Sequence, residues 1–238
     1  MPAFQTSRVR RKHGKIMKIS KEEFQLQRTP RELQEYVSRA YEHIRSHPEL
    51  GKPARLKKEP YKIFSEELLP FSAFCSWKYR DRTDVLCSLL PGTPAGDAVV
   101  QDRTAGADHL VEITWPMEGR EAVEEGRQLN ERGMTDTKIW DYQDIAPHLE
   151  AVQRALSVGR KKSLKDYRTK GGSTLLLVFG EYPYFWQDNP KHQAMLDLLI
   201  QGLRSIEFKV DNVAVLPVPS KRIIEVKSTE QAGRGERE

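Results

Sequence analysis

The sequence predicts an α/β protein with a mixed central sheet flanked by helices. The first observation is the order of its segments: a helix, strands, a hairpin, two helices, a strand, a helix and two last strands. Such alternation is typical of α/β folds. The second is an uninterrupted apolar run at 173–179, which is typical of a central strand covered on both faces. The third is a hairpin at 97–114, where one carboxylate, Glu112, interrupts the apolar residues of a strand.

The composition predicts one globular domain with polar ends. Of the 238 residues, 38% are hydrophobic and 31% are charged. We expect a disordered basic arm at 1–27, a single α/β domain at 28–227 and a disordered tail at 228–238. Seven Lys or Arg residues precede the first acid, Glu22, and subtracting them from the net charge of +5 leaves about −2 for the remainder. The arm is either a phosphate-contacting segment or a solvated tail.

The sequence predicts neither a membrane span nor secretion. The longest strongly apolar run, 174–179, is far shorter than the roughly 20 residues that a spanning helix needs. No apolar segment typical of a signal peptide follows the basic N-terminus. Cys75 and Cys87 match no metal-ligand spacing. We expect them to be small buried apolar residues in a reducing compartment. A disulfide between them is an alternative that stays open. We expect the protein to be cytoplasmic.

The first part of the domain predicts one strong helix. Thr29, Pro30 and Glu32 make a capping box with proline at the first helical position, and apolar residues at spacings of three and four continue to about Ser46. The stretch 48–60, rich in Pro and Lys, is expected to be a loop, either a solvated connector or a second phosphate-contacting patch. Next we expect a short helix at 65–69 and strands at 71–79 and 84–90.

The later part predicts helices at 119–132, 144–167 and 190–206, and strands at 173–179, 213–218 and 223–226. The C-terminal part of the second of these helices carries Arg160, Lys161, Lys162, Lys165, Arg168 and Lys170. Cations at a helix C-terminus suit the macrodipole, but six of them exceed what the dipole needs. The aromatic segment 181–186 follows a strand end where α/β sheets place ligands. Its rings either stack on bases or pack within a loop.

The hairpin carries the clearest candidate site. Antiparallel pairing of strands at 97–102 and 108–114 brings Asp97 and Glu112 together. Charged side chains are rarely buried unless they are paired or bind a metal. Two interpretations stay open: a two-carboxylate metal site, or a structural pair in which Asp97 caps a turn and Glu112 binds an arginine such as Arg103.

Other common catalytic motifs are absent from the sequence. It contains no Walker loop, no GxGxxG and no GxSxG, and its six histidines show no metal-ligand spacing. We expect His109 to be a strand-edge residue.

The order of elements around Asp97 and the tripeptide Glu112-Ile113-Thr114 resembles the PD-(D/E)XK, or restriction-endonuclease-like, superfamily. There, a helix precedes a sheet, an aspartate on one strand is followed by Glu-x-Lys on the next, and a further helix and strand complete the core. The helix with Lys161-Lys162 and the strand at 175–178 match these later elements. The resemblance covers about 30–180 and implies a restriction-endonuclease-like core.

The resemblance also implies a nuclease that uses Mg²⁺. Phosphodiester cleavage needs a divalent metal that binds a phosphate oxygen, activates water and offsets charge on the leaving group, and magnesium prefers oxygen ligands. The implied ligands are Asp97, Glu112 and the carbonyl of Ile113, with Glu35 or Glu42 of the first helix as a further carboxylate.

Thr114 stands where the superfamily has its lysine, and threonine cannot carry the charge that orients the attacking water. Either a lysine arrives from elsewhere, with Lys161 and Lys162 as the best candidates, or the site is impaired. The implied catalytic residues are therefore Asp97, Glu112, Thr114, Lys161 and Lys162.

Nucleic acid is the expected partner, and a membrane is not. The expected contacts are Arg8, Arg10, Arg11 and Lys12 in the arm, and Arg160, Lys165 and Arg168 after the hairpin. Two functions stay open. One is a metal-dependent nuclease, a hydrolase, and the other is a catalytically inactive nucleic-acid-binding or protein-partner module on the same scaffold.

Overall fold

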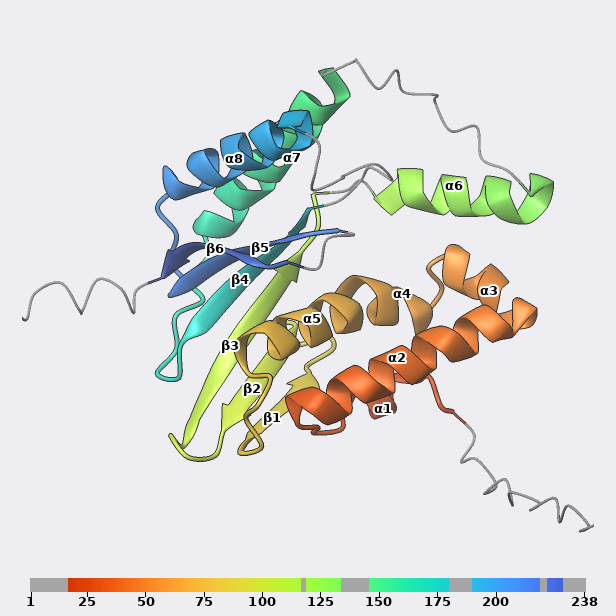
Figure 1. The fold of residues 1–238 in the computed structure, drawn as a ribbon, viewed down its shortest axis with the longest axis horizontal. Helices are drawn as coiled ribbons and strands as arrows, with labels where there is room; N and C mark the ends of the chain where they lie inside the picture. The colour runs from red at the N-terminus through yellow and green to blue at the C-terminus, as the bar shows by residue number, and fades with distance from the viewer. Residues whose placement is uncertain (1–16, 117–118, 134–145, 180–189, 219–221, 229–238) are drawn as a thin grey trace, which may run out of the picture.

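The computed structural model describes residues 17–116, 119–133, 146–179, 190–218 and 222–228, which place helices on both faces of one open sheet (Figure 1). The strands are β1 (Val85–Leu89), β2 (Ala98–Asp102), β3 (Ala107–Thr114), β4 (Ser173–Phe179), β5 (Asn212–Pro217) and β6 (Ile224–Ser228). They lie side by side in chain order. The β3–β4 and β4–β5 pairs are parallel and the other pairs are antiparallel. The predicted mixed α/β sheet is therefore confirmed.

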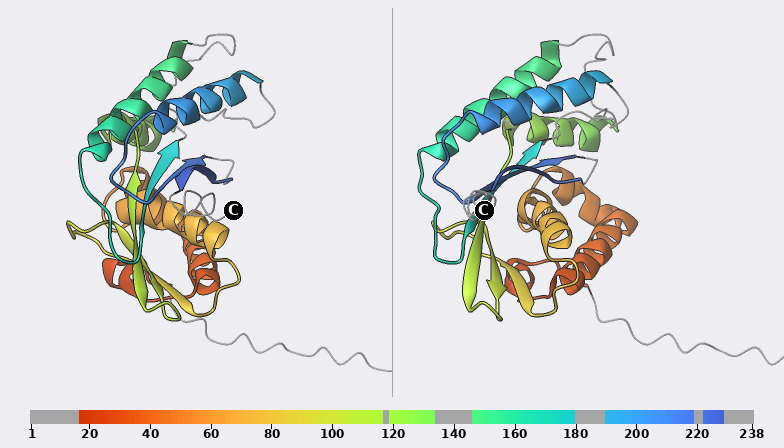
Figure 2. Two further views of the ribbon diagram at one scale, coloured as in Figure 1. Left: turned by 90° about the vertical axis from the view of Figure 1, so that its left-hand side faces the viewer. Right: turned by 60° about the vertical axis from the view of Figure 1, so that its left-hand side comes forward.

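The described helices lie in layers above and below the sheet (Figure 2). They are α1 (Lys21–Gln25), α2 (Pro30–Ser46), α3 (Pro48–Arg55), α4 (Tyr61–Ile63), the π-helix η1 (Phe64–Leu68), α5 (Leu69–Lys78), α6 (Gly119–Arg132), α7 (Ala146–Ser163) and α8 (Pro190–Arg204). α1, α2 and α5 cover one face, and α7 and α8 cover the other. No helix in the described ranges is long and apolar enough to cross a membrane.

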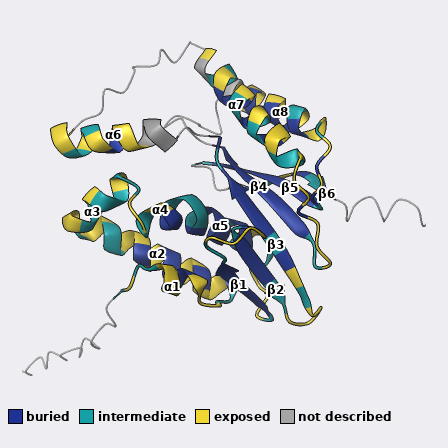
Figure 3. Ribbon diagram, turned by 180° about the vertical axis from the view of Figure 1, so that it is seen from behind, coloured by how far each residue is buried: buried dark blue, intermediate teal, exposed yellow. Residues whose placement is uncertain are grey.

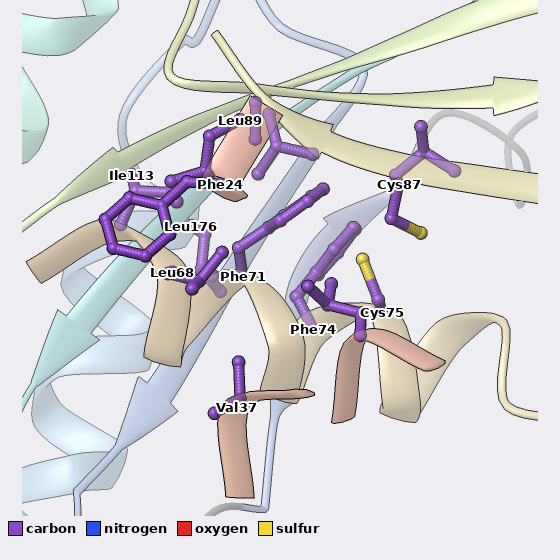
Figure 4. Close-up of a cluster of buried hydrophobic side chains, with 14 of the residues drawn as sticks. Phe24, Val37, Leu68, Phe71, Phe74, Cys75, Cys87, Leu89, Ile113 and Leu176 are labelled. Carbon is purple, nitrogen blue, oxygen red and sulfur yellow. The ribbon is translucent and has the colours of Figure 1, made fainter. Parts of the chain in front are cut away.

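Alternating strand positions build two separate apolar cores. Figure 3 shows the strands buried along most of their length and the outer helix faces exposed. Leu176 belongs to the core under α2 and α5, part of which is drawn in Figure 4. Its neighbours Leu175 and Leu177 belong to the core under α7 and α8, because successive side chains of a strand point to opposite faces. The central position predicted for β4 is thus confirmed.

The predicted start of α2 is confirmed. The N–H of Glu32 donates to Oγ1 of Thr29 over 3.3 Å, and the N–H of Thr29 donates to the Glu32 carboxylate over 2.9 Å. This is the reciprocal capping box that the sequence indicated.

The stretch 71–79 was expected to be a strand, and this prediction is wrong because it forms most of helix α5. Its buried residues include Phe71, Phe74 and Cys75, at helical spacings of three and four. A short apolar run fits both periods, and Pro70 in the first turn suits a helix start.

Three other segments differ from the predictions. Residues 48–55, expected to be loop, form α3, which begins at Pro48. The supposedly disordered arm contains α1, whose Phe24 is fully buried in the core. The helix expected to reach Tyr167 ends at Ser163. Residues 1–16, the aromatic segment 181–186 and the tail at 229–238 lie outside the described residues.

Cys75 on α5 and Cys87 on β1 are free and buried, and their sulfur atoms point toward one another (Figure 4). The expected role as small buried residues is confirmed, since burial and the neighbouring Cys87 raise the pKa of the Cys75 thiol and make it a poor nucleophile.

Candidate active site

The register of the β2–β3 hairpin places Asp97 and Glu112 opposite each other. Ala98 pairs with Val111, so the next pair along the two strands is Asp97 with Glu112. Opposite residues of an antiparallel pair present their side chains to the same face of the sheet. Glu112 faces the layer of α7, because Lys162 of that helix binds it. The predicted strand pairing, which sets Asp97 opposite Glu112, is therefore the arrangement found.

Asp97 lies at the point where β2 begins and is held by backbone on both sides. Its N–H donates to the Val111 carbonyl over 3.1 Å, and its Oδ2 accepts the N–H of Ile113 over 2.7 Å. Burial raises the pKa of Asp97, the hydrogen bond from Ile113 lowers it, and the charge of Glu112 raises it again. Asp97 thus binds the strand that carries Glu112 and does not cap its own turn.

Glu112 is 8% exposed and has a cationic partner. Nζ of Lys162 donates to its Oε1 over 2.5 Å, and the Tyr167 hydroxyl donates to the same oxygen over 3.3 Å. The alternative that Glu112 binds Arg103 is therefore wrong. A buried carboxylate with a paired charge and a second donor satisfies the condition under which charges are buried.

Tyr167 follows α7 and closes the site from the side of β5. Its N–H donates to the Lys209 carbonyl over 2.9 Å, which holds the ring against the sheet. The pKa of the Tyr167 hydroxyl is raised well above its usual value, first by burial and then by the charge of Glu112. The hydroxyl therefore stays a hydrogen-bond donor to Glu112 over the physiological pH range.

Glu67 is a further carboxylate within electrostatic range of Asp97, and the sequence interpretation missed it. It lies on η1, and its pKa is raised to about 7 by burial, by the charge of Asp97 and by that of Glu66. The adjacent pair Glu66-Glu67 inside an otherwise apolar helical segment is the signal that would have identified it. Carboxyl groups with pKa values near neutrality are typical of functional sites.

Trp115 connects η1 to the end of β3. Its indole N–H donates to the Glu66 carbonyl over 2.8 Å, and the Glu66 carboxylate binds Nζ of Lys57 over 2.7 Å. π-turns alter the usual i to i−4 bonding of a helix and occur frequently at functional sites. Here Trp115 ties the backbone of η1 to the end of β3, within range of the charge of Asp97 that acts on Glu67.

The structure separates the sequence-predicted site residues into two groups. Lys162, and not the exposed Lys161, reaches Glu112. Thr114 is buried two residues after Glu112 and so faces the same side of the sheet. Glu35 is exposed on α2 and pairs with Arg31, so it does not join the pair. Glu42, also on α2, is exposed too.

Of the predicted nucleic-acid contacts after the hairpin, Lys165 lies beside this site. Arg160 is exposed on the last turns of α7. Nζ of Lys165 donates to the Pro94 carbonyl over 3.1 Å and lies 4.7 Å from the centre of the Tyr167 ring. Arg168 pairs with the carboxylate of its neighbour Asp166. The arm residues Arg8, Arg10, Arg11 and Lys12 lie outside the described residues.

The carboxylate oxygens of the site suit a hard divalent cation that takes only a few of its ligands from the protein. The hydrogen bonds above engage Oδ2 of Asp97 and Oε1 of Glu112, which leaves Oδ1 and Oε2 as the oxygens available to a metal. The Ile113 carbonyl points to the same strand edge as its N–H. Among the described residues no group of three or more His, Cys, Asp or Glu is arranged to hold a metal. Magnesium often uses only one or two carboxylates and keeps several waters.

Comparison of the chain with family models, with curated proteins and with solved structures found no match. A functional conclusion therefore depends on the geometry of the site.

Proposed function

We propose that this chain is a divalent-metal-dependent nuclease with a restriction-endonuclease-like core, in which Lys162 takes the role of the lysine that the motif lacks. The order α5–β1–β2–β3–α7–β4 supports the fold part of the proposal, with α6 as an insertion before α7. Asp97 at the start of β2 and Glu112 on β3 stand where the superfamily has its acidic residues.

The observation that carries the proposal is the 2.5 Å contact between Nζ of Lys162 and Oε1 of Glu112. In the superfamily motif, lysine follows glutamate by two positions on one strand, and the two side chains share a face. Here that strand position holds Thr114, and α7 brings a lysine to the same face from outside the sheet. The missing charge is thereby restored beside the two carboxylates.

Each residue of the site has a role in phosphodiester hydrolysis. Bound magnesium would supply Lewis-acid stabilisation of the phosphate and a more acidic water. Asp97 and Glu112 would hold it, and the ammonium group of Lys162 orients the attacking water and offsets charge on the phosphate. Tyr167 fixes the rotamer of Glu112 through its hydroxyl. Glu67, with a pKa of about 7, accepts a proton near neutral pH.

Moving the lysine tests this proposal. Single- and double-stranded DNA and RNA are incubated with the protein and Mg²⁺ or Mn²⁺. We expect Lys162→Met to lower the cleavage rate by a factor of about 10³, as loss of a preorganised charge does. We expect Thr114→Lys in the Lys162→Met background to raise the cleavage rate at least about tenfold above that of Lys162→Met alone, because the lysine then occupies the motif position.

Lys161→Met is the matched control, since Lys161 is exposed on the same turn. At saturating protein, where a lost phosphate contact does not limit the rate, it should cleave like wild type. Circular dichroism and thermal unfolding show that each variant is folded. The proposal is contradicted if the wild-type protein cleaves none of the substrates, or if Lys162→Met is fully active.

A second function is favoured by one observation: Lys162 already neutralises Glu112, and no third ligating group closes on the pair among the described residues. That arrangement also suits a catalytically inactive module that only binds nucleic acid. In that case binding weakens with salt and on deletion of residues 1–21, and no product forms with any metal. Absent or salt-independent binding points to a protein partner.

A further inference from the structure

Leu164 is the most exposed large apolar side chain in the described part of the chain. Its relative exposure is 80%, whereas the next highest value among such residues is 51%, at Leu26. Burying a leucine side chain contributes roughly 1.5–3 kcal/mol, so a partner that covers Leu164 would gain that free energy on binding. It lies in the turn that follows α7.

Exposed cations precede and follow Leu164 along the chain: Arg160, Lys161, Lys165, Arg168 and Lys170. Arg168 is paired with Asp166, so the other four carry the excess positive charge. The helix macrodipole accounts for cations at the end of α7, but it does not account for an apolar side chain among them. A protein partner with an apolar pocket would have to desolvate these cations. A nucleic acid meets the cations with phosphates and offers Leu164 the apolar faces of its bases.

The turn is fixed next to the candidate active site. Lys162 precedes Leu164 by two residues and Tyr167 follows it by three, and both bind Oε1 of Glu112. Lys165 is anchored to the Pro94 carbonyl in the loop before Asp97. The chain on both sides of Leu164 is therefore attached to the site, which places Leu164 in a turn next to it.

We propose that Leu164 is a wedge that enters the base stack of the substrate next to the scissile phosphate, while the surrounding cations hold the backbone. This inference rests on the proposed function and specifies its substrate class: a nucleic acid opened at one base step. Apolar wedges unstack bases at a cost of a few kcal/mol, which contacts to the deformed backbone offset.

The experiment measures binding and base unstacking together. DNA duplexes and single strands containing 2-aminopurine are titrated with protein in EDTA, so that no strand is cut. We expect wild-type protein to raise 2-aminopurine fluorescence at one position of the duplex. We expect Leu164→Ala to abolish this rise and to weaken binding about tenfold, with an unchanged dependence of affinity on salt.

Two further variants make the result specific. Leu198→Ala removes a leucine that is 43% exposed on α8, and it should behave like wild type. Lys161→Ala should lower the slope of log affinity against log salt by about 0.9 for duplex DNA, without abolishing the fluorescence rise.

The outcomes separate the wedge from the function on which it rests. If wild type binds and cleaves nucleic acid but Leu164→Ala unstacks bases equally well, the wedge is wrong and the nuclease stands. If wild type neither binds nor cleaves any nucleic acid, both proposals fail.

Discussion

His109 and Glu112 are two buried polar residues three positions apart on β3, and they face opposite layers of helices. His109 is 8% exposed, contacts Oγ1 of Thr174 through Nε2 over 2.8 Å, and stacks on Phe74 of α5. Glu112 is equally buried but binds a charged lysine. The expectation that His109 lies at a strand edge is wrong, because the apolar layer of α5 covers it.

The difference between these two sites distinguishes a structural polar residue from a candidate functional one. Burial, followed by the charge of Lys78, lowers the pKa of His109 to about 4, so the ring is neutral and satisfied within the core. At the other site, burial and the charge of Glu112 raise the pKa of Asp97, and burial and the charge of Asp97 raise the pKa of Glu67. Opposed and perturbed charges in one place are the pattern of a reactive site.

The largest expected effect comes from removing the charge of Glu112. Glu112→Gln should lower cleavage by at least about 10³-fold, because it removes the proposed metal ligand and the partner of Lys162. Rates are measured under single-turnover conditions with Mn²⁺. Glu35→Gln is the control, since Glu35 is exposed. Equal rates in wild type and Glu112→Gln would remove Glu112 from the site.

His109 should affect stability and not chemistry. A histidine whose pKa falls from 6.5 to about 4 on folding contributes stability that is complete above pH 6.5 and is lost as the pH falls toward 4. Relative to His109→Gln, wild type should lose on the order of 3 kcal/mol of unfolding free energy over that range. Urea unfolding at several pH values measures it.

Cleavage per folded molecule at neutral pH should be the same in His109→Gln and wild type. A large loss of cleavage in a stably folded His109→Gln would break the distinction between the two sites.

For the contribution of Glu67 to stability we expect the opposite dependence on pH. Its pKa rises from 4.5 to about 7 on folding, so its contribution to stability is complete below pH 4.5 and is lost as the pH rises through about 7. Relative to Glu67→Gln, wild type should lose on the order of 2 kcal/mol between pH 4.5 and 8, allowing for its partial exposure. Chemical unfolding at both pH values measures the difference, and a constant difference would mean that Glu67 is not held near Asp97.

Trp115 should give the smallest effect. Trp115→Phe keeps the ring and removes the hydrogen bond to the Glu66 carbonyl, a loss of about 1 kcal/mol. The pH at which Glu67 titrates should then move toward 4.5, since η1 is less firmly held against Asp97. The pH profile of cleavage reports this movement, and an unchanged profile would show that Trp115 does not position Glu67.

Local signals in the sequence predicted the elements that depend on neighbours in the chain. The capping box at Thr29, the apolar run of β4 and the hairpin of Asp97 and Glu112 are such cases. The α5 segment was predicted wrongly because its apolar residues fit two periods.

The partners in the site were harder to predict because they come from distant segments. Lys162 lies 50 residues from Glu112 in the chain, and the sequence offered Lys161 equally. Glu67 comes within electrostatic range of Asp97 through the packing of η1, which precedes α5 in the chain. No pattern within one segment specifies contacts between residues of distant segments. These contacts arise from the packing of α5 and α7 against the sheet.

Calorimetric titration with Mn²⁺ tests most directly whether Asp97 and Glu112 form a metal site. Wild type should bind Mn²⁺ with release of protons that increases below about pH 7, because the carboxyls with raised pKa values must ionise. Glu112→Gln and Asp97→Asn should each lose this binding, and Glu35→Gln should keep it. Absence of Mn²⁺ binding to wild type, or unchanged binding in Glu112→Gln, would contradict the account.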